Sequence, residues 1–194
     1  MTPPLSILSR KVIDADWNPQ IIIYPTLKSP AMYDRDKYRF WATCRDDFTC
    51  NPESRTLKFW IRGRPLPQKR SYRGRNGNMV SESKSAQNEL ASLIENLLKY
   101  RNGGEFPTWY RDSHRINLNC LYVFPAGSRH PAVCADIDNL QKFVFDAFQT
   151  SGLIRDDADI QCSKHKKVTD HFFNERTYFL RETGGYYFGL NCFH

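Results

Sequence analysis

The sequence predicts a mixed α/β fold of the α+β kind, in which two main helices pack on one mixed β-sheet. Stretches 57–61 and 116–124 alternate apolar residues, which predicts strands, because successive side chains of a strand face opposite sides of the sheet. Stretches 86–98 and 140–148 repeat apolar residues at helical spacing. The order strand, helix, strand, helix, strand, strand favours a mixed sheet with helices packed on it.

The start of the chain differs from the rest in composition and in the pattern of its apolar residues. The 194 residues suffice for one domain with a sizeable core. Short apolar pieces at the start are interrupted by prolines, namely Pro3, Pro4, Pro19, Pro25 and Pro30. We therefore expect an N-terminal extension over residues 1–54 with one or two strands and no readable role, followed by a regular domain over residues 55–194.

A basic loop over residues 64–79 follows the first regular strand. It is rich in Arg, Lys, Gly and Asn and contains no acid. Such a loop can follow a DNA backbone, since Lys and Arg supply most phosphate contacts, although a solvated surface loop is the alternative. The candidate DNA-binding residues in it are Arg64, Lys69, Arg70, Arg73 and Arg75.

The remaining elements have recognisable ends. Ser81 can cap the first helix, because a serine hydroxyl accepts a hydrogen bond from a free backbone N–H. Asp138 or Asn139 can cap the second helix, and Gly152 is expected to end it. Two strands close the chain, a highly basic one over residues 160–168 and a strongly aromatic one over residues 186–193.

The charge balance favours a polyanionic partner. Lys and Arg number 28 against 21 Asp and Glu, which gives a net charge of +7. No apolar run approaches the ~20 residues that cross a bilayer, and the N-terminus lacks the apolar region of a secretion signal. The six cysteines form no CxxC pair, as is typical of reduced thiols. We expect a soluble, non-secreted protein that does not bind membranes.

An acidic motif lies in residues 135–157, which read ADIDNLQKFVFDAFQTSGLIRDD. Asp136 and Asp138 are one residue apart, Lys142 follows one helical turn later, and Asp156 and Asp157 come after the next turn. We expect the second pair to return to the same end of the sheet as the first. Clustered oxygen ligands suit Mg²⁺ or Mn²⁺ better than zinc. In the alternative interpretation Asp138 caps the helix and pairs with Lys142, and the second pair is a solvated turn.

Two segments of this motif, DIDNLQKFVFDAF and GLIRDDADI, resemble the signature of the RusA-type Holliday junction resolvases. These phage-derived endodeoxyribonucleases cut four-way DNA junctions. The resemblance runs roughly from Leu57 to the C-terminus, so it implies a RusA-like endonuclease domain over residues 55–194. It also implies a symmetric homodimer with one site for each of two opposed strands. The chain departs from the family pattern at Val133, Cys134 and Ala135, where the member compared has arginines.

The resemblance assigns roles by position. The family's three metal-binding aspartates correspond to Asp136, Asp138 and Asp157, and a lysine of its catalytic set corresponds to Lys142. Asn139, inside the motif, is a further candidate for DNA binding. A divalent ion on these carboxylates would lower the pKa of its water and orient the attack on the phosphate. Lys142 lies four residues after Asp138, hence on the same helix face, where its charge can offset developing negative charge.

We therefore expect a Mg²⁺-dependent endonuclease, with Mn²⁺ as an alternative ion, that resolves Holliday junctions by paired symmetric nicks during DNA recombination and repair. Its partners would be branched DNA and a second copy of the chain. A flap or other branched-DNA endonuclease with the same carboxylates is one alternative. A DNA-binding protein that has kept the fold without cutting is another, although clustered carboxylates facing a polyanion argue against it. The expected location is the cytoplasm, at the nucleoid or a site of viral DNA processing.

Overall fold

The computed structural model describes residues 40–43, 48–69, 72–73, 79–80, 83–128, 135–169 and 173–192. Several predicted features lie outside these ranges. They are the loop residues Arg70 and Arg75 and residues 1–39 of the expected N-terminal extension. Ser81 also lies outside them, and its prediction as the cap of the first long helix is wrong, because Ser83 occupies the N-cap position.

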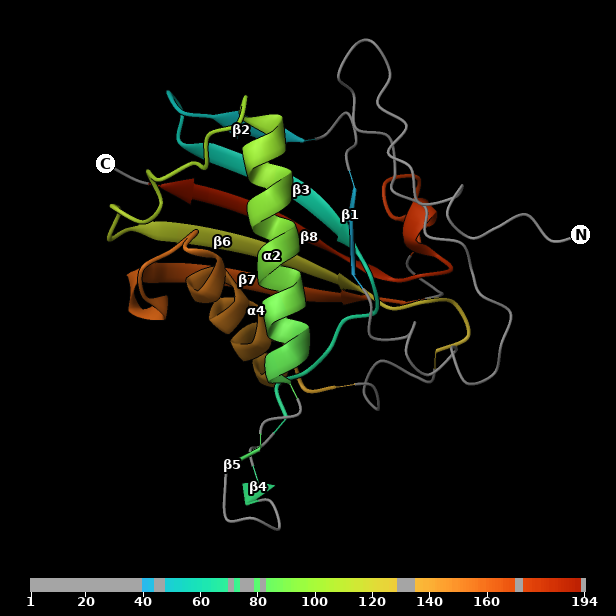
Figure 1. Cartoon of the computed structure of the whole chain (residues 1–194). Helices are drawn as coiled ribbons and strands as arrows, with labels where there is room; N and C mark the ends of the chain where they lie inside the picture. The colour runs from blue at the N-terminus through green and yellow to red at the C-terminus, as the bar shows by residue number, and fades with distance from the viewer. Residues whose placement is uncertain are drawn as a thin grey trace, which may run out of the picture.

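A mixed six-stranded sheet runs through the described part of the molecule (Figure 1). Its strands are β1 (Trp41–Thr43), β2 (Thr49–Asn51), β3 (Thr56–Arg62), β6 (Ile116–Val123), β7 (Ile160–Val168) and β8 (Gly185–Cys192). The order is β1-β3-β8-β6-β7, and β2 also pairs with β3. The β6–β7 pair is parallel and the other pairs are antiparallel. Strands β1 and β2 precede residue 55, so the last part of the expected extension joins this sheet.

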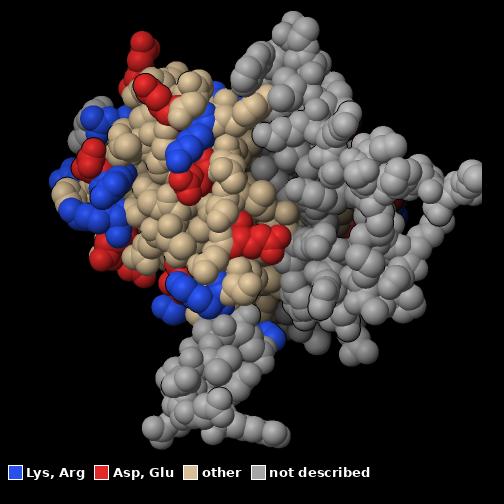
Figure 2. Space-filling model, in the orientation of Figure 1, with Lys and Arg blue, Asp and Glu red and all other residues tan. Residues whose placement is uncertain are grey.

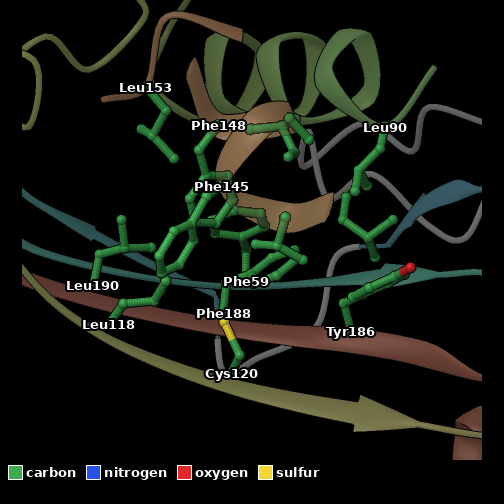
Figure 3. Close-up of a cluster of buried hydrophobic side chains, with 14 of the residues drawn as sticks. Phe59, Leu90, Leu118, Cys120, Phe145, Phe148, Leu153, Tyr186, Phe188 and Leu190 are labelled. Carbon is green, nitrogen blue, oxygen red and sulfur yellow. The ribbon is translucent and has the colours of Figure 1, made fainter. Parts of the chain in front are cut away.

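Helices α2 (Lys84–Arg101) and α4 (Ile137–Ser151) cover one face of the sheet (Figure 1). Their predicted apolar stripes form the core, in which Leu90 of α2 and Phe148 of α4 point toward Phe59 and Phe188 of the strands (Figure 3). The ring centroid of Phe188 lies 5.0 Å from that of Phe148 and 5.1 Å from that of Phe59. The predicted fold class is thus confirmed. Within the described ranges, no helix combines the length and apolar character that a membrane span needs.

The opposite face of the sheet carries a smaller core made of Trp60, Val123, Val168 and Leu180. Leu180 belongs to the short helix η4 (Tyr178–Leu180) and packs tightly over Gly185. A Cβ at Gly185 would lie 2.6 Å from Leu180 Cδ1 and 2.8 Å from the backbone oxygen of Ile61. A glycine is therefore required for this close approach of η4 to β3 and β8.

Helix α4 begins earlier than the sequence predicts. Asp136, with extended backbone angles, occupies the N-cap position, and its carbonyl accepts the N–H of Leu140 over 3.1 Å. Asp138 and Asn139 already lie in the first helical turn, so neither is the cap. The predicted end at Gly152 is confirmed, and its φ of 74° lies in the left-handed region that favours glycine.

The crossover from β6 through α4 to β7 fixes where the two ends of this helix lie. Because β6 and β7 are parallel, α4 must run antiparallel to both strands. It begins at the end of the sheet where β6 and β7 finish, and it ends where β7 starts (Figure 1). Its 15 residues span about 22 Å at the usual helical rise.

Candidate active site

An exposed acidic pair marks the start of α4. The Asp136 side chain makes no capping hydrogen bond, and Asp138 is the acidic residue of the first turn. Both residues are exposed. The first N–H groups of a helix lack partners within the helix, and the helix dipole favours negative charge there. The backbone therefore offsets part of the repulsion between these two carboxylates.

The start of the basic loop lies against the same end of α4. The N–H of Gln68 donates to the carbonyl of Asn139 over 2.8 Å, and the N–H of Lys69 donates to the Ser83 hydroxyl over 2.8 Å. Segment 67–69 is thereby tied to the beginnings of both helices. Figure 2 shows Lys and Arg side chains at this lower edge of the described surface. Lys69 is exposed and Arg64 half-buried.

The rest of the basic loop is described only in part. Arg73 lies in the two-residue strand β4 (Tyr72–Arg73), which pairs with β5 (Met79–Val80). This ladder projects beyond the N-terminal end of α2 (Figure 1). The backbone of Arg73 thus belongs to a short hairpin, away from the main sheet.

One lysine of the highly basic stretch 160–168, which the sequence groups with Lys164 and Lys166, lies beside the acidic pair. The ammonium of Lys167, near the end of β7, donates to the carbonyl of Ala135, the residue before Asp136. In a strand, residues two apart share a face, so Lys167 lies on the helix-covered face with His165. Lys164 and Lys166 are exposed on the other face. The alternation of exposure along β7, combined with the crossover, is the signal that could have identified Lys167.

Lys142 lies one turn along α4 from the acidic pair. Its ammonium is 4.0 Å from Asp146 Oδ1, and its side chain is 62% exposed. Asp146 also accepts a hydrogen bond from Gln87 Nε2 over 3.0 Å, which links α4 to α2. Among the described residues, the ion pair of Lys142 is with Asp146, so the pairing with Asp138 considered in the alternative interpretation is not present.

The second acidic pair lies at the opposite end of α4, which corrects the expectation that it returns to the first. Asp157 opens the short helix η2 (Asp157–Asp159), and Asp156 caps it by accepting the Ala158 N–H over 2.9 Å. That hydrogen bond, followed by one with the Asp157 side chain and the charge of Arg155, lowers the pKa of Asp156. Both acids are exposed. The length of α4 keeps them away from Asp136 and Asp138.

Within the described part of one chain, the start of α4 supplies two carboxylates to a metal ion. In the described ranges, no three His, Cys, Asp or Glu side chains lie close enough together to hold an ion. Asp136 and Asp138 do offer oxygen ligands of the type that Mg²⁺ and Mn²⁺ prefer. The chemistry of this pair fits a hard divalent ion, and the family resemblance assigns it a third carboxylate, that of Asp157.

Comparison with known protein families decides the class of protein. The family model described as Endodeoxyribonuclease RusA matches residues 62–173, more than half of the chain. The chain belongs to the RusA endodeoxyribonuclease family. No curated protein matches the sequence significantly. The matched region includes both acidic pairs, α2 and α4, and the whole basic loop.

Membership of the RusA family indicates which kind of reaction the described geometry serves. Members are endodeoxyribonucleases that act on branched DNA junctions, and they generally depend on divalent metal ions. The family resemblance of the two signature segments is thus confirmed. Membership of the family supports nuclease activity for this chain. The positions of individual ligands and DNA contacts in this chain stay predictions.

Proposed function

We propose that this protein is a Mg²⁺-dependent endonuclease that resolves Holliday junctions by paired symmetric nicks in DNA recombination and repair. The observation that carries the proposal is the exposed Asp136–Asp138 pair at the start of α4, inside the region matched by the RusA family. Segment 67–69 and Lys167 lie against the same helix end and supply positive charge there. We expect it to act in the cytoplasm, at the nucleoid or a site of viral DNA processing.

Asp136 and Asp138 would hold the divalent ion, Mg²⁺ or alternatively Mn²⁺. When bound, such an ion lowers the pKa of a water ligand and stabilises negative charge on a phosphate. Lys167, fixed to the carbonyl of Ala135, would attract the DNA phosphate toward the acidic pair. Lys142 lies one turn further along α4 and would offset charge that develops during cleavage.

The third carboxylate would be that of Asp157 of the partner subunit. Within one chain, Asp157 lies at the far end of α4, a helix that packs on the sheet through its whole apolar stripe. Moving it to Asp136 would require unpacking that core. A two-fold symmetric dimer can instead place the start of each α4 beside the far end of the partner's α4, and symmetry then makes two equivalent sites. This arrangement supports the homodimer that the family resemblance implies.

The basic loop would hold the DNA. We assign phosphate contacts to Arg64, Lys69, Arg70, Arg73 and Arg75 and a contact to Asn139, because the loop starts at the same helix end as the acidic pair. Such contacts make affinity depend strongly on salt. They position the strand without reading its sequence.

One assay tests the proposal against its alternatives. A synthetic four-way junction, a flap and a linear duplex are incubated with Mg²⁺ and either the wild type or Asp138→Asn, which keeps the shape of the side chain and removes its charge. We expect symmetric cuts in the junction that fall about 10³-fold in the variant, while binding is retained. Preference for the flap would favour the branched-DNA alternative. Binding without cutting in the wild type would favour the non-catalytic one.

A further inference from the structure

A separate polar cluster lies at the end of the sheet where β6 and β7 begin. His114 lies two residues before β6, and Asp159 immediately precedes β7. The first residues of these strands, Ile116 and Ile160, are paired in the sheet. Arg155 lies in the connection after α4, two residues before Asp157. The cluster therefore adjoins the turn that carries Asp157.

The three side chains converge on one carboxylate oxygen. Arg155 Nη2 donates to Asp159 Oδ1 over 3.0 Å, and His114 Nδ1 lies 3.1 Å from the same oxygen. Arg155 Nη2 and His114 Nδ1 are 2.7 Å apart. The Asp159 side chain is 7% exposed, whereas those of His114 and Arg155 are 68% and 54% exposed. A buried anion thus holds two nitrogen-bearing groups side by side at the surface.

This arrangement leaves hydrogen-bonding groups of His114 and Arg155 directed toward solvent. His114 Nδ1 can accept a hydrogen bond from Arg155 Nη2, which lies 2.7 Å away; the ring proton then stays on Nε2, which faces away from the carboxylate and can donate outward. A guanidinium has five N–H donors, and within the described ranges the hydrogen bonds of Arg155 all run through Nη2. Among the described residues, Asp159 Oδ2 is buried and has no hydrogen-bond partner, so Asp159 contacts His114 and Arg155 through Oδ1 alone.

The surrounding charges decide which ligand fits. The neighbouring acids Asp156 and Asp157 are exposed and repel a phosphate, so DNA can approach this turn only where a cation faces it. Figure 2 shows blue and red side chains intermixed at the left edge of the described surface, the end at which β7 begins. Arginine binds phosphate oxygens with a planar fork, and an imidazole N–H adds a further donor.

We propose that His114 and Arg155, held by Asp159, bind a phosphate of the DNA backbone next to the phosphate that is cut. The inference rests on the proposed function, which brings a DNA strand to the turn of Asp157. The two residues are positioning residues: they hold the strand against that turn and do not touch the reacting atoms. Asp159 acts through them by fixing both side chains.

Binding measurements test this contact with a matched control. Arg155→Gln and His114→Gln are compared with Lys99→Gln, which removes the same charge from a lysine paired with Glu95 near the end of α2. For Arg155→Gln we expect the Kd for a four-way junction to rise about tenfold, because losing one hydrogen bond to a charged group weakens binding by about that much. The slope of log affinity against log salt should become shallower by about 0.9. His114→Gln should weaken binding less, and Lys99→Gln should match the wild type.

Cleavage and folding are measured on the same variants. KM should rise for Arg155→Gln while kcat at saturating junction changes less than about twofold, as expected of uniform binding. Arg155→Lys keeps a cation beside Asp159 without the fork, so it should keep the wild-type Tm and recover part of the affinity. Equal affinity and salt slope for Arg155→Gln and Lys99→Gln would overturn the inference. A wild type that binds junctions through Arg155 without cutting them would contradict the proposed function and still support this phosphate contact.

Discussion

The two ends of helix α4 carry acidic pairs in different surroundings. At the start, Asp136 and Asp138 are exposed, and Lys167 and segment 67–69 lie against the backbone beside them. At the far end, Asp156 is engaged by the Ala158 N–H, so Asp157 is the acid of that pair without a capping role. One end offers two carboxylates and the other offers one.

This difference gives the dimer a chemical reason. Within the described ranges, neither end alone brings three carboxylates close enough together to hold an ion, and the packed length of α4 separates the two ends by about 22 Å. Two copies related by a two-fold axis can join the start of one helix to the far end of the other. Each complete site would then need both subunits, and a monomer would lack a third ligand.

The largest expected effect distinguishes the two acids at the far end. Asp157→Asn should lower junction cleavage about 10³-fold, because it removes the proposed third metal ligand. Asp156→Asn should lower it less than about tenfold, since asparagine still accepts the Ala158 N–H and keeps the turn. Single-turnover cleavage rates in Mg²⁺ measure both. Equal losses in the two variants would show that the pair acts as a unit and that the helix cap is not the role of Asp156.

The next largest expected effect is a loss of stability when the packing of α4 on the sheet is weakened. Phe148→Ala removes a fully buried ring that packs on Phe188, so it should reduce the free energy of unfolding by about 3 to 5 kcal/mol. Tyr178→Ala, at a side chain that is 58% exposed, should change it by less than about 0.5 kcal/mol. Urea titrations followed by circular dichroism compare them. A small loss for Phe148→Ala would mean that α4 is not fixed to the sheet.

The smallest effect lies at the boundary between α4 and the far end. Gly152→Ala should reduce the free energy of unfolding by about 1 kcal/mol, because the φ of 74° is unfavourable for any residue with a Cβ. A Cβ there would meet no atom within 4 Å, so the cost is conformational rather than steric. Thermal and urea unfolding provide the value. An unchanged stability would indicate that the helix end is not held in the left-handed conformation.

Local sequence patterns predicted most of the fold. Alternation identified β3 and β6, and the stripe from Leu140 to Phe148 identified α4, because burial of one face imposes these periods. The cap of α4 was placed two or three residues late. Asp136, Asp138 and Asn139 are all good capping residues, and local sequence alone does not tell which of them has the extended backbone of a cap.

The site required topology as well as pattern. The sequence identified the two acidic pairs but placed Asp157 at the wrong end of the sheet for a single chain. A strand, a 15-residue helix and a further strand normally form a parallel crossover, which would have separated the ends of the helix. The contact of Lys167 with Ala135 depends on the register of β7 beside α4, and the Asp159 cluster depends on the pairing of β6 with β7. Neither follows from local spacing.

Subunit mixing tests the shared site most directly. Asp138→Asn and Asp157→Asn chains are co-expressed with different tags, and the mixture is compared with each variant alone. In a shared site, every mixed dimer retains one site with all three carboxylates, so nicking of the junction should return to about a quarter of the wild-type rate in an equal mixture. Paired cuts should stay absent, because the second site carries both substitutions. If each site is contained in one chain, the mixture will remain as inactive as the separate variants, which would contradict the proposed arrangement.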